Sequence, residues 1–321
     1  MTQAPQVVVV GSFNVDHVWT LARLPRAGET RVGSYRTGPG GKGFNQATAA
    51  ARAGAATAFI CALGDDAGGQ LARRLAGEDG IDLRADPMQA PTGTAGIYVD
   101  HGGNNSIVIG PGANAGLSPG FIQRHVDALS QSAVVLAQLE SPLEAIATAF
   151  ALARESGALT MLNPAPADAE LPATLLALSD VITPNESEFC AQLGRHAGEA
   201  CDPDQVAMLD DATLHAHCRR LLPHGTVVVT LGAQGCFVSH APPAHHGDGR
   251  ASYRVAASPA HPVDTTGAGD AFNGALAASI ARDPRQPFAR HVAFASRYAA
   301  RSTERSGAAV AMPHLAELTE H

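Results

Sequence analysis

Short apolar segments alternate along the chain with segments whose apolar residues recur at helical spacing. Residues 7–10 are four consecutive valines followed by a glycine, a pattern that favours a central strand buried on both faces. Four similar segments lie at residues 133–139, 158–162, 181–183 and 226–231. Residues 119–130 place Ile122, Val126 and Leu129 on one face of a helix. This alternation predicts an α/β domain of three layers, in which helices flank a central, mostly parallel sheet.

One helix has a recognisable start. Ser141 and Glu144 have the spacing of a capping box, and Pro142 falls at the expected first helical position. The pattern that follows predicts a helix that continues to about Glu155. Since no linker-like segment interrupts the chain, we expect residues 1–321 to form a single domain.

Two stretches, about residues 15–38 and 94–110, break the alternation of strand and helix. They contain strand-like segments separated by glycine, proline and asparagine turns, with no helical segment inside either stretch. The strand-like segments are residues 15–21, 30–37, 94–99 and 106–109. We expect them to form a small antiparallel sheet that projects from the main body and acts as a lid.

The composition excludes several classes of protein. The chain has 321 residues, of which 45% are hydrophobic and 16% charged, so it is neither disordered nor a coiled coil. Its formal net charge of −8 argues against a nucleic-acid-binding protein, which needs a basic surface. The sequence contains no apolar run of about 18 residues, and it does not open with a basic segment followed by an apolar one. We therefore expect a cytoplasmic protein without a membrane span.

The cysteines give no sign of a metal site. They are scattered along the chain, and none forms a C-x-x-C pair. In a cytoplasmic protein this distribution predicts thiols in the core or at the surface. The five residues are Cys61, Cys190, Cys201, Cys218 and Cys236.

The segment from Asp264 to Asp270 carries the strongest chemical signal. Phe272 and Leu276 continue it with helical apolar spacing, so its glycines lie at the N-terminus of a helix. Free backbone amides and the helix dipole attract an anion to such an end, and the missing side chains let it approach. A carboxylate beside that anion, at Asp270, suits a general base that takes a proton from an attacking hydroxyl. The alternative is an aspartate that only stabilises the first helical turn.

A second glycine-rich segment, residues 38–46, precedes an alanine-rich helix. It is not a Walker A sequence, because no serine or threonine follows Lys42 and the glycine spacing differs. Closely spaced glycines allow the backbone to approach a ligand, and the amide of Asn45 can donate to and accept from a sugar hydroxyl. The alternative is a flexible glycine turn.

Polar residues also follow two of the predicted strands. Asn14 and Asp16 lie just past the carboxyl end of the first strand, and Glu140 directly follows the segment 133–139. Open parallel sheets bind ligands at this edge. The two carboxylates are therefore candidates for binding pairs of sugar hydroxyls, although a single carboxylate at such a place is more often an ordinary loop charge.

Two further segments suit a nucleotide. Asn185 and Glu188 open a helix after residues 181–183, where they either cap that helix or position a hydrated Mg²⁺. The turn that follows residues 226–231 either cradles a nucleotide or forms a simple hairpin. It consists of Thr230, Leu231, Gly232, Ala233, Gln234 and Gly235.

Two of these segments resemble the signatures of the PfkB family of carbohydrate kinases. Residues 264–274 are similar to its C-terminal signature and residues 40–46 to its N-terminal signature. The similarity covers nearly the whole chain, from Gly11 to Gly307. Three other segments are most similar to members that phosphorylate ribose, namely residues 138–142, 163–167 and 183–186.

The resemblance implies a role for each matching residue. Asp270 matches the catalytic base, and Gly267, Ala268 and Gly269 match the anion hole that faces the transferred phosphoryl group. Glu188 matches an acidic position linked indirectly to Mg²⁺. The expected sugar contacts are Asn14, Asp16, Gly41, Lys42, Asn45, Glu140 and Asp270. The expected nucleotide contacts are Asn185, residues 230–235 and Gly269.

The resemblance further implies a site for a monovalent cation, usually K⁺, built largely from backbone carbonyls. Its matching residues are Asp264, Thr266, Ser302, Arg305 and Gly307. Three residues depart from the family pattern. Ala311 replaces a serine near that cation, and Phe44 replaces a small residue beside the sugar contacts. Pro111, directly after the lid segment 94–110, lies where some relatives carry a polar residue. Phe44 and Pro111 therefore concern the choice of sugar, and Ala311 concerns the cation site.

Together these features predict an ATP-dependent sugar kinase that uses Mg²⁺, is activated by K⁺ and forms a homodimer through its lid sheets. Its expected ligands are ribose or a similar sugar and ATP or ADP, with no nucleic acid or membrane partner. The first alternative is a kinase of the same fold for deoxyribose, a nucleoside or a phosphosugar, the last of which requires an additional cation at the pocket. The second alternative is a non-catalytic sensor of sugar or nucleotide, against which the intact Asp270 and its glycine neighbours argue.

Overall fold

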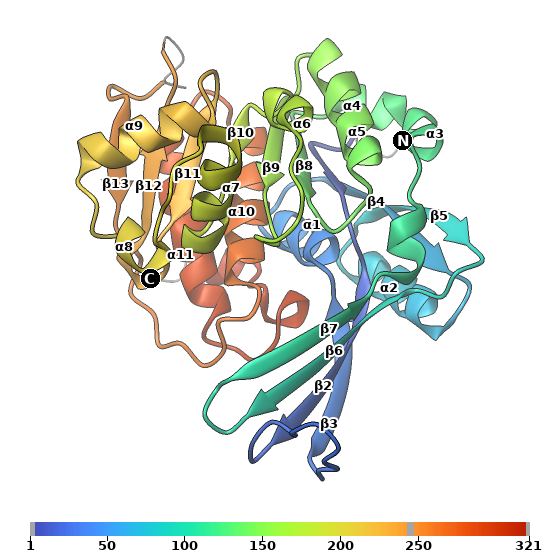
Figure 1. Cartoon of the computed structure of the whole chain (residues 1–321). Helices are drawn as coiled ribbons and strands as arrows, with labels where there is room; N and C mark the ends of the chain where they lie inside the picture. The colour runs from blue at the N-terminus through green and yellow to red at the C-terminus, as the bar shows by residue number, and fades with distance from the viewer. Residues whose placement is uncertain (1–3, 243–246, 319–321) are drawn as a thin grey trace.

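The computed structural model describes residues 4–242 and 247–318, and a sheet of nine strands forms its centre (Figure 1). The strands lie in the order β13-β12-β11-β10-β9-β8-β1-β4-β5. All pairs from β11 to β5 are parallel, whereas β12 and β13 pair antiparallel. The predicted, mostly parallel sheet is therefore confirmed. The bounds are β1 Val7–Val10, β4 Thr57–Gly64, β5 Asp82–Met88, β8 Val134–Gln138, β9 Leu159–Asn163, β10 Val181–Ile182, β11 Thr226–Thr230, β12 Cys236–Ser239 and β13 Ser252–Val255.

Four strands of the large sheet, β4, β5, β12 and β13, fall outside the apolar segments identified in the sequence. Strand β4 is buried along its whole length, so it lacks the alternation of apolar and polar residues, and its alanine and glycine content weakens the strand signal. Strand β5 is one edge strand and carries Asp82, Arg84 and Pro87, which are typical of sheet edges. Strand β13, at the other edge of the sheet, pairs with β12 and begins at the end of a turn-rich stretch.

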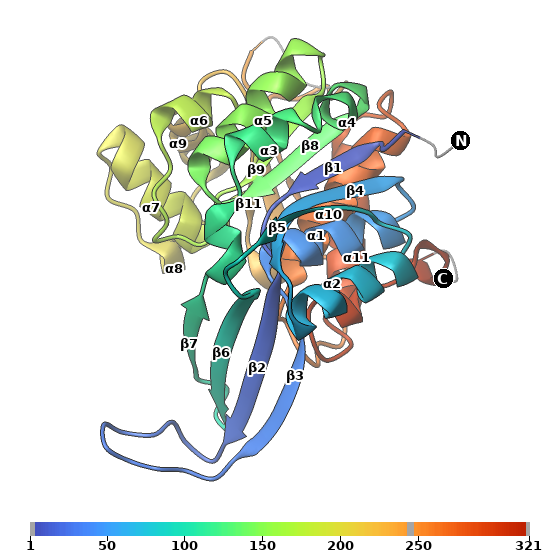
Figure 2. The ribbon, with the colours of Figure 1, turned by 90° about the vertical axis from the view of Figure 1, so that its right-hand side faces the viewer.

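Helices cover both faces of the large sheet, which gives the three predicted layers (Figures 1 and 2). The alternation along β1 separates two cores: Val7 and Val9 pack on one face, and Val8 and Val10 on the other. The first face is covered by α1 Lys42–Arg52, α2 Ala67–Glu78, α10 Ala268–Arg282 and α11 Phe288–Ser302. The second face is covered by α3 Pro119–Gln123, α4 Val126–Gln131, α5 Leu143–Glu155, α6 Ala173–Ala177, α7 Glu186–Ala197, α8 Pro203–Val206 and α9 Asp211–Leu221. Among the described residues, none of the helices has both the length and the apolar character that a membrane span requires.

Two helix predictions need correction. The helix expected over residues 119–130 is divided into α3 and α4, which are separated at Arg124 and His125. The capping box at Ser141 is absent, because Pro142 has an extended ψ of 127° and itself serves as the N-cap of α5. The hydroxyl of Ser141 is buried and has no hydrogen-bond partner in the described part of the chain.

A second sheet of four strands projects from the main body, as the sequence predicted (Figures 1 and 2). Its order is β3-β2-β6-β7, with bounds β2 Asn14–Leu21, β3 Ser34–Gly40, β6 Gly93–Asp100 and β7 Asn105–Gly110. The outer pairs are antiparallel hairpins, and the central pair, β2 with β6, is parallel. This arrangement follows because both hairpins leave the main body with their first strand pointing outward. The register places the rings of His17, Trp19, Tyr35 and Tyr98 on one face of this small sheet.

The prediction of five thiols is wrong for one pair of cysteines. Cys190 in α7 forms a disulfide with Cys201, and their Cα atoms lie 4.9 Å apart, within the range that a disulfide spans. Gly198 ends α7 in the left-handed conformation and turns the chain back, which brings the two residues together. Cys61, Cys218 and Cys236 are buried thiols, as expected.

Candidate active site

The first turns of α1 and α10 meet beside the carboxyl ends of β1 and β8 (Figure 2). Both helices begin at a glycine with positive φ, 87° at Gly41 and 76° at Gly267. A Cβ atom on Gly41 would lie within 2.9 Å of backbone atoms of residues 12–14, so only glycine fits there. The two helices touch at Gly274, where a Cβ would lie 2.4 Å from the carbonyl oxygen of Gln46. This close packing brings side chains more than 200 residues apart in sequence into contact.

Asp270 lies at the centre of these contacts, in the first turn of α10, and only 6% of its surface is exposed. Its Oδ2 accepts a hydrogen bond from Asn45 Nδ2, and its Oδ1 accepts one from Gln46 Nε2, both at 2.9 Å. Burial raises the pKa of Asp270 above its ordinary value, while the nearby Lys42 and the two amide donors act against this rise. A buried, oriented carboxylate with a raised pKa has the properties of a general base.

Lys42, at the start of α1, is the single lysine of the sequence. Its backbone N–H donates to Glu140 Oε2 at 3.0 Å, and the hydroxyl of Ser12 donates to the same oxygen at 2.6 Å. Burial by itself lowers the pKa of Lys42, but the carboxylates of Asp270, Glu140 and Glu188 raise it above its ordinary value. One ammonium group thus lies near three carboxylates beside the first turns of α1 and α10.

Asp16 adds a further carboxylate from β2. It lies opposite Gly38 of β3, and a Cβ on the nearby Gly40 would lie 2.1 Å from its Oδ1, so the glycines make room for it. Burial, and after it the charge of Glu140, raise the pKa of Asp16 to about 7, although Arg36 acts in the opposite direction. Asp16 is therefore poised between its neutral and charged forms near neutral pH.

Asn14, the first residue of β2, is buried and held by a second asparagine. Asn114 Nδ2 donates to Asn14 Oδ1 at 2.9 Å and to the carbonyl oxygen of Phe13 at the same distance. The Oδ1 atom of Asn114 accepts from the N–H of Phe13 at 3.0 Å. The junction of β1 and β2 is thereby fixed, and Asn14 is turned toward Asn114.

The two segments expected to bind a nucleotide lie side by side. Asn185 and Thr230 form an isolated parallel bridge, and the N–H of Thr230 donates to the carbonyl oxygen of Pro184 at 2.9 Å. Asn185 and Glu188 form a complete capping box at the start of α7, so the capping alternative is realised in the structure. The turn after β11 contains a short helix, Gly232–Gln234, whose residues are exposed. Glu188 is buried, and this burial raises its pKa.

The proposed anion hole is only partly open. Ala268 donates its N–H to the carbonyl oxygen of Thr265 at 3.1 Å, so the expectation of a free amide is wrong at this position. A Cβ on Gly267 would lie 2.8 Å from the methyl group of Ala308, whereas a Cβ on Gly269 would meet no described atom of another segment within 4 Å. The space beside Gly269 is therefore where a ligand can approach the backbone.

The residues expected around a monovalent cation divide into two groups. The carboxylate of Asp264 accepts from the N–H of Thr266 and from the N–H of Gly307, both at 2.9 Å, which draws the two loops together. The side chains of Ser302 and Arg305 are engaged elsewhere, with the carbonyl oxygen of Ala299 and with Glu317 respectively. In the described parts of the chain, no three His, Cys, Asp or Glu side chains group together in a way that could hold a metal ion.

Several polar residues that build the site were not given a role from sequence. Ser12 fixes Glu140, Asn114 fixes Asn14, and Gln46 donates to the carboxylate of Asp270. All three are buried polar residues, and such residues need a partner. Gln46 lies in the family signature next to Asn45, so its position was visible in the sequence although its partner was not.

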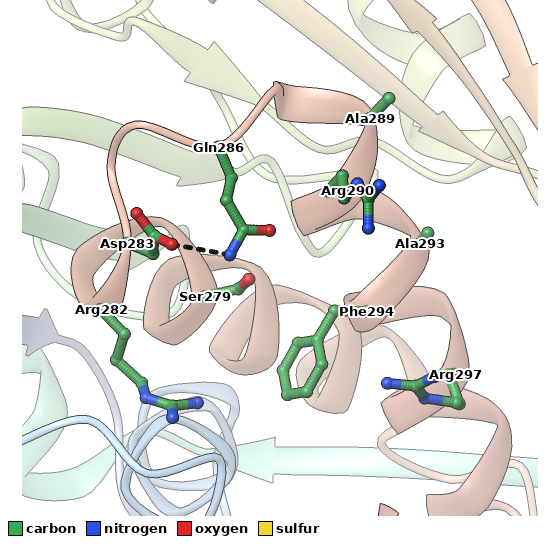
Figure 3. Close-up of a pocket in the computed structure, with 9 residues that line it drawn as sticks. All are labelled: Ser279, Arg282, Asp283, Gln286, Ala289, Arg290, Ala293, Phe294 and Arg297. Atoms are coloured by element: carbon green, nitrogen blue, oxygen red, sulfur yellow. Dashed lines mark hydrogen bonds between the residues drawn. The ribbon is translucent and has the colours of Figure 1, made fainter.

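A separate hollow lies between α10 and α11, away from these residues (Figure 3). Its volume is about 780 Å³, and Arg282, Arg290 and Arg297 line it together with Asp283 and Phe294. Arg282 is at the C-terminal end of α10, twelve residues from Asp270, which corresponds to about 18 Å along a helix. None of its lining residues belongs to the polar set described above.

Comparison with known proteins identifies the chemistry of this site. The chain matches the family described as pfkB family carbohydrate kinase over residues 4–315. The chain belongs to the PfkB family of carbohydrate kinases. This PfkB kinase is therefore a phosphotransferase that acts on a sugar hydroxyl.

Three relatives illustrate the similarity of this PfkB kinase to known proteins. A ribokinase of Haemophilus influenzae is 35% identical over 317 residues, which cover 98% of this chain and 97% of that protein. The structure of Arabidopsis thaliana ribokinase complexed with ribose and ATP has a TM-score of 0.83 at 29% identity, covering 99% of this chain and 100% of that one. A bifunctional ribokinase/ribose-5-phosphate isomerase A of Fructilactobacillus sanfranciscensis is 39% identical over 284 residues, 87% of this chain. The matched region is only 49% of that protein, so the chain spans about half its length.

Proposed function

We propose that this PfkB kinase phosphorylates D-ribose with ATP, yielding D-ribose 5-phosphate and ADP. The observation that carries the proposal is the buried carboxylate of Asp270 at the N-terminus of α10. It accepts hydrogen bonds from the side-chain amides of Asn45 and Gln46 and lies near Lys42. The similarity to ribokinases over almost the entire chain supports ribose as the acceptor.

Asp270 acts as the general base in this proposal. The 5-hydroxyl oxygen of ribose forms a bond to the γ-phosphorus of ATP, the bond to the bridging oxygen breaks, and ADP leaves with that electron pair. The hydroxyl proton passes to the carboxylate of Asp270. The space beside Gly269, at the positive end of α10, is where the backbone of residues 267–269 faces the transferred phosphoryl group.

The sugar is held between the start of α1 and the small sheet. Asp16 and Glu140 accept hydrogen bonds from sugar hydroxyls, and Lys42 donates one. Asn45 Oδ1 is buried and has no hydrogen-bond partner among the described residues, so a sugar hydroxyl completes its bonding. The backbone approaches the sugar at Gly41, and Asn14 and Asp270 complete the contact set.

The nucleotide lies along the two segments that meet at Asn185 and Thr230. Its contacts are Asn185, residues 230–235 and Gly269. Mg²⁺ fits this arrangement through Glu188, because Mg²⁺ in kinases commonly uses one or two carboxylates together with phosphate oxygens and water. When bound, the ion neutralises charge on the phosphates. Glu188 Oε2 accepts from the N–H of Asn185 at 2.9 Å, which leaves its other oxygen for the hydrated ion.

A K⁺ ion is proposed where the loops around Asp264 meet, with Thr266, Ser302, Arg305 and Gly307 as further contributors. Since the side chains of Ser302 and Arg305 are engaged elsewhere, these residues contribute backbone carbonyls. Ala311 lacks a hydroxyl, so we expect the preference for K⁺ over Na⁺ to be weak and to increase in Ala311→Ser. Equal activity in K⁺, Na⁺ and a bulky organic cation would rule this site out.

We further propose that the small sheet is a lid over the sugar and the contact between two copies of the single domain, in the cytoplasm. The support for the contact is exposed apolar surface on one face of the small sheet: Tyr35 and Val108, which the register places on the same face as Tyr98, are 53% and 66% exposed. Sedimentation of the wild type and of Val108→Asp tests this, because a charge in the contact should yield monomers.

The decisive experiment compares the wild type with Asp270→Asn in an assay of ADP release from ATP. The variant keeps the size of the side chain but cannot accept the proton, so we expect kcat to fall by about 10²–10⁴ with little change in either KM. Asp283→Asn, at the other end of α10, is the matched control and should keep full activity. Near wild-type activity of Asp270→Asn would contradict the mechanism.

The same assay separates the alternative substrates. A panel of ribose, deoxyribose, a nucleoside and fructose 1-phosphate reports which acceptor has the highest kcat/KM. The candidate cation for binding a phosphosugar is Arg36, which acts electrostatically on Asp16. Preference for the phosphosugar would therefore point to Arg36, and absence of turnover with every acceptor would favour a sensor.

A further inference from the structure

Both ends of the Gln46 side-chain amide are engaged inside the protein. Its Nε2 lies 2.9 Å from Asp270 Oδ1 and 3.0 Å from Asn163 Oδ1, and it donates to both oxygens. Its Oε1 accepts from Gln138 Nε2 at 2.5 Å. Gln46 and Gln138 have no exposed surface. A reversed Gln46 amide would set its oxygen against the carboxylate, so the donation from Gln138 fixes the direction in which Gln46 points its N–H groups.

These bonds continue through the ends of two strands and return to α10. Asn163, at the end of β9, donates from Nδ2 to the carbonyl oxygen of Thr183 at 3.2 Å. The hydroxyl of Thr183 donates to Asn273 Oδ1 at 2.5 Å, and Asn273 Nδ2 donates to the carbonyl oxygen of Gly269 at 2.8 Å. This network of hydrogen bonds therefore runs from Asp270 back to Gly269, the residue before it. It joins α1, β9, the residue that follows β10, and α10.

Gln138, at the other end of this hydrogen-bond network, is confined by packing. A Cβ atom on Gly11 would lie 2.3 Å from Gln138 Oε1 and 2.7 Å from the Cα of Gly43. The glycine at the end of β1 thus leaves the space that the Gln138 amide occupies. Gln138 cannot move toward β1, and its remaining freedom is taken up by the bond to Gln46.

We propose that Gln46 is a positioning residue: its amide, oriented by Gln138 and Asn163, fixes the plane of the Asp270 carboxylate and keeps that carboxylate ionised for proton transfer. The inference rests on the proposed role of Asp270 as the base. Each oxygen of Asp270 accepts one amide hydrogen bond, from Gln46 or from Asn45, and keeps a second lone pair for the sugar hydroxyl.

The surroundings of Asp270 explain why a donor is needed. Asp16, Glu140 and Glu188 are negative charges near it, and Lys42 is the positive charge that faces it. Burial and these carboxylates raise the pKa of Asp270, whereas Lys42 and the amide donors lower it. Removing the donation from Gln46 therefore raises the pKa of the base, and the acidic limb of activity moves to higher pH.

The test measures kcat/KM for ribose between pH 5 and pH 9, which reports groups of the free enzyme. In Gln46→Met we expect the acidic limb to move upward by about one pH unit, so that kcat/KM at pH values below the limb falls by up to about tenfold. Gln46→Glu places a second carboxylate beside Asp270, and two carboxylates sharing one proton should move the limb further. Gln138→Met, one bond further away, should cause a smaller shift, and its effect should not add to that of Gln46→Met.

Gln192 provides a matched control, because it is an equally buried glutamine on α7 whose amide makes no bond to the site. Gln192→Met should leave the pH profile of the wild type unchanged. If folded Gln46→Met has the pH profile of the wild type while Asp270→Asn is inactive, the inference about Gln46 is overturned and the proposed base is not. If instead Asp270→Asn is active, the proposed base itself is wrong, so the two failures are distinguishable.

Discussion

Asp16 should weaken the folded state when it is ionised, and Asp16→Asn tests this. In the folded protein its pKa is raised to about 7, from an ordinary value of 3.8, first by burial and then by Glu140. The folded state thus holds this proton more tightly than the unfolded chain does. The free energy of unfolding therefore decreases as pH rises from about 4 to about 7, and the loss is complete above pH 7.

The size of the effect follows from the shift in the pKa of Asp16. A difference of about three units corresponds to about 4 kcal/mol, at 1.36 kcal/mol per unit. This figure is an upper limit, because Asp16 is partly exposed and water screens its charge. We expect Asp16→Asn to increase the free energy of unfolding by about 1–3 kcal/mol at pH 8, with a gain that grows between pH 4 and pH 7.

The assay is urea unfolding of the sugar-free protein at several pH values. Arg36→Gln serves as the companion variant, since Arg36 lowers the pKa of Asp16 and its loss should move the pH window upward. Asp16→Asn should also raise the KM for ribose about ten- to a hundredfold, because a charged hydrogen bond is lost. A gain in stability that does not depend on pH, or no gain at pH 8, would refute the reasoning.

Two further predictions concern packing and charge. Gly274→Ala should lower the free energy of unfolding by about 1–3 kcal/mol, because its Cβ would lie 2.4 Å from the carbonyl oxygen of Gln46. Gly77→Ala is the control: its Cβ meets no described atom within 4 Å, so its melting temperature should equal or exceed that of the wild type. Since Lys42 is the single lysine, protein labelled with ¹³C-lysine should give one side-chain NMR signal. The pKa read from this signal should lie above the ordinary value of 10.5, and the signal should shift when ribose is added. A pKa below 10.5 would contradict the carboxylate-rich environment.

The fold was largely predictable because β-branched runs and helical periodicity are local properties of the sequence. The valines of β1 and the apolar segment of β11 identified their strands directly, whereas β4 was missed because its two alanines and its terminal glycine are weak strand formers. The capping box expected at Ser141 failed because Pro142 already holds the extended conformation of an N-cap. Such outcomes depend on backbone angles that residue spacing alone does not determine.

The site was predictable in its residues but not in its connections. The glycine-rich segments marked Asn45 and Asp270, yet their hydrogen bond joins residues 225 positions apart in the chain. That contact exists because α1 and α10 approach each other at Gly274, and nothing in the spacing of either motif encodes the approach. For the same reason Gln46 was visible only as part of a motif, and its donation to Asp270 emerged from the packing of the two helices.

The electrostatics around Asp270 give a physical reason why sugar binding, as proposed here, should be coupled to catalysis. Asp16, Glu140 and Asp270 share this region with Lys42, and burial together with mutual repulsion raises the pKa of both aspartates. Hydroxyl groups of a sugar donate hydrogen bonds to such carboxylates and favour their charged forms. In the proposed binding mode, the sugar therefore lowers the pKa of Asp16 and Asp270, and the acceptor itself helps to prepare the proposed base. The same coupling requires that ribose stabilise the protein more strongly at pH 7 than at pH 5.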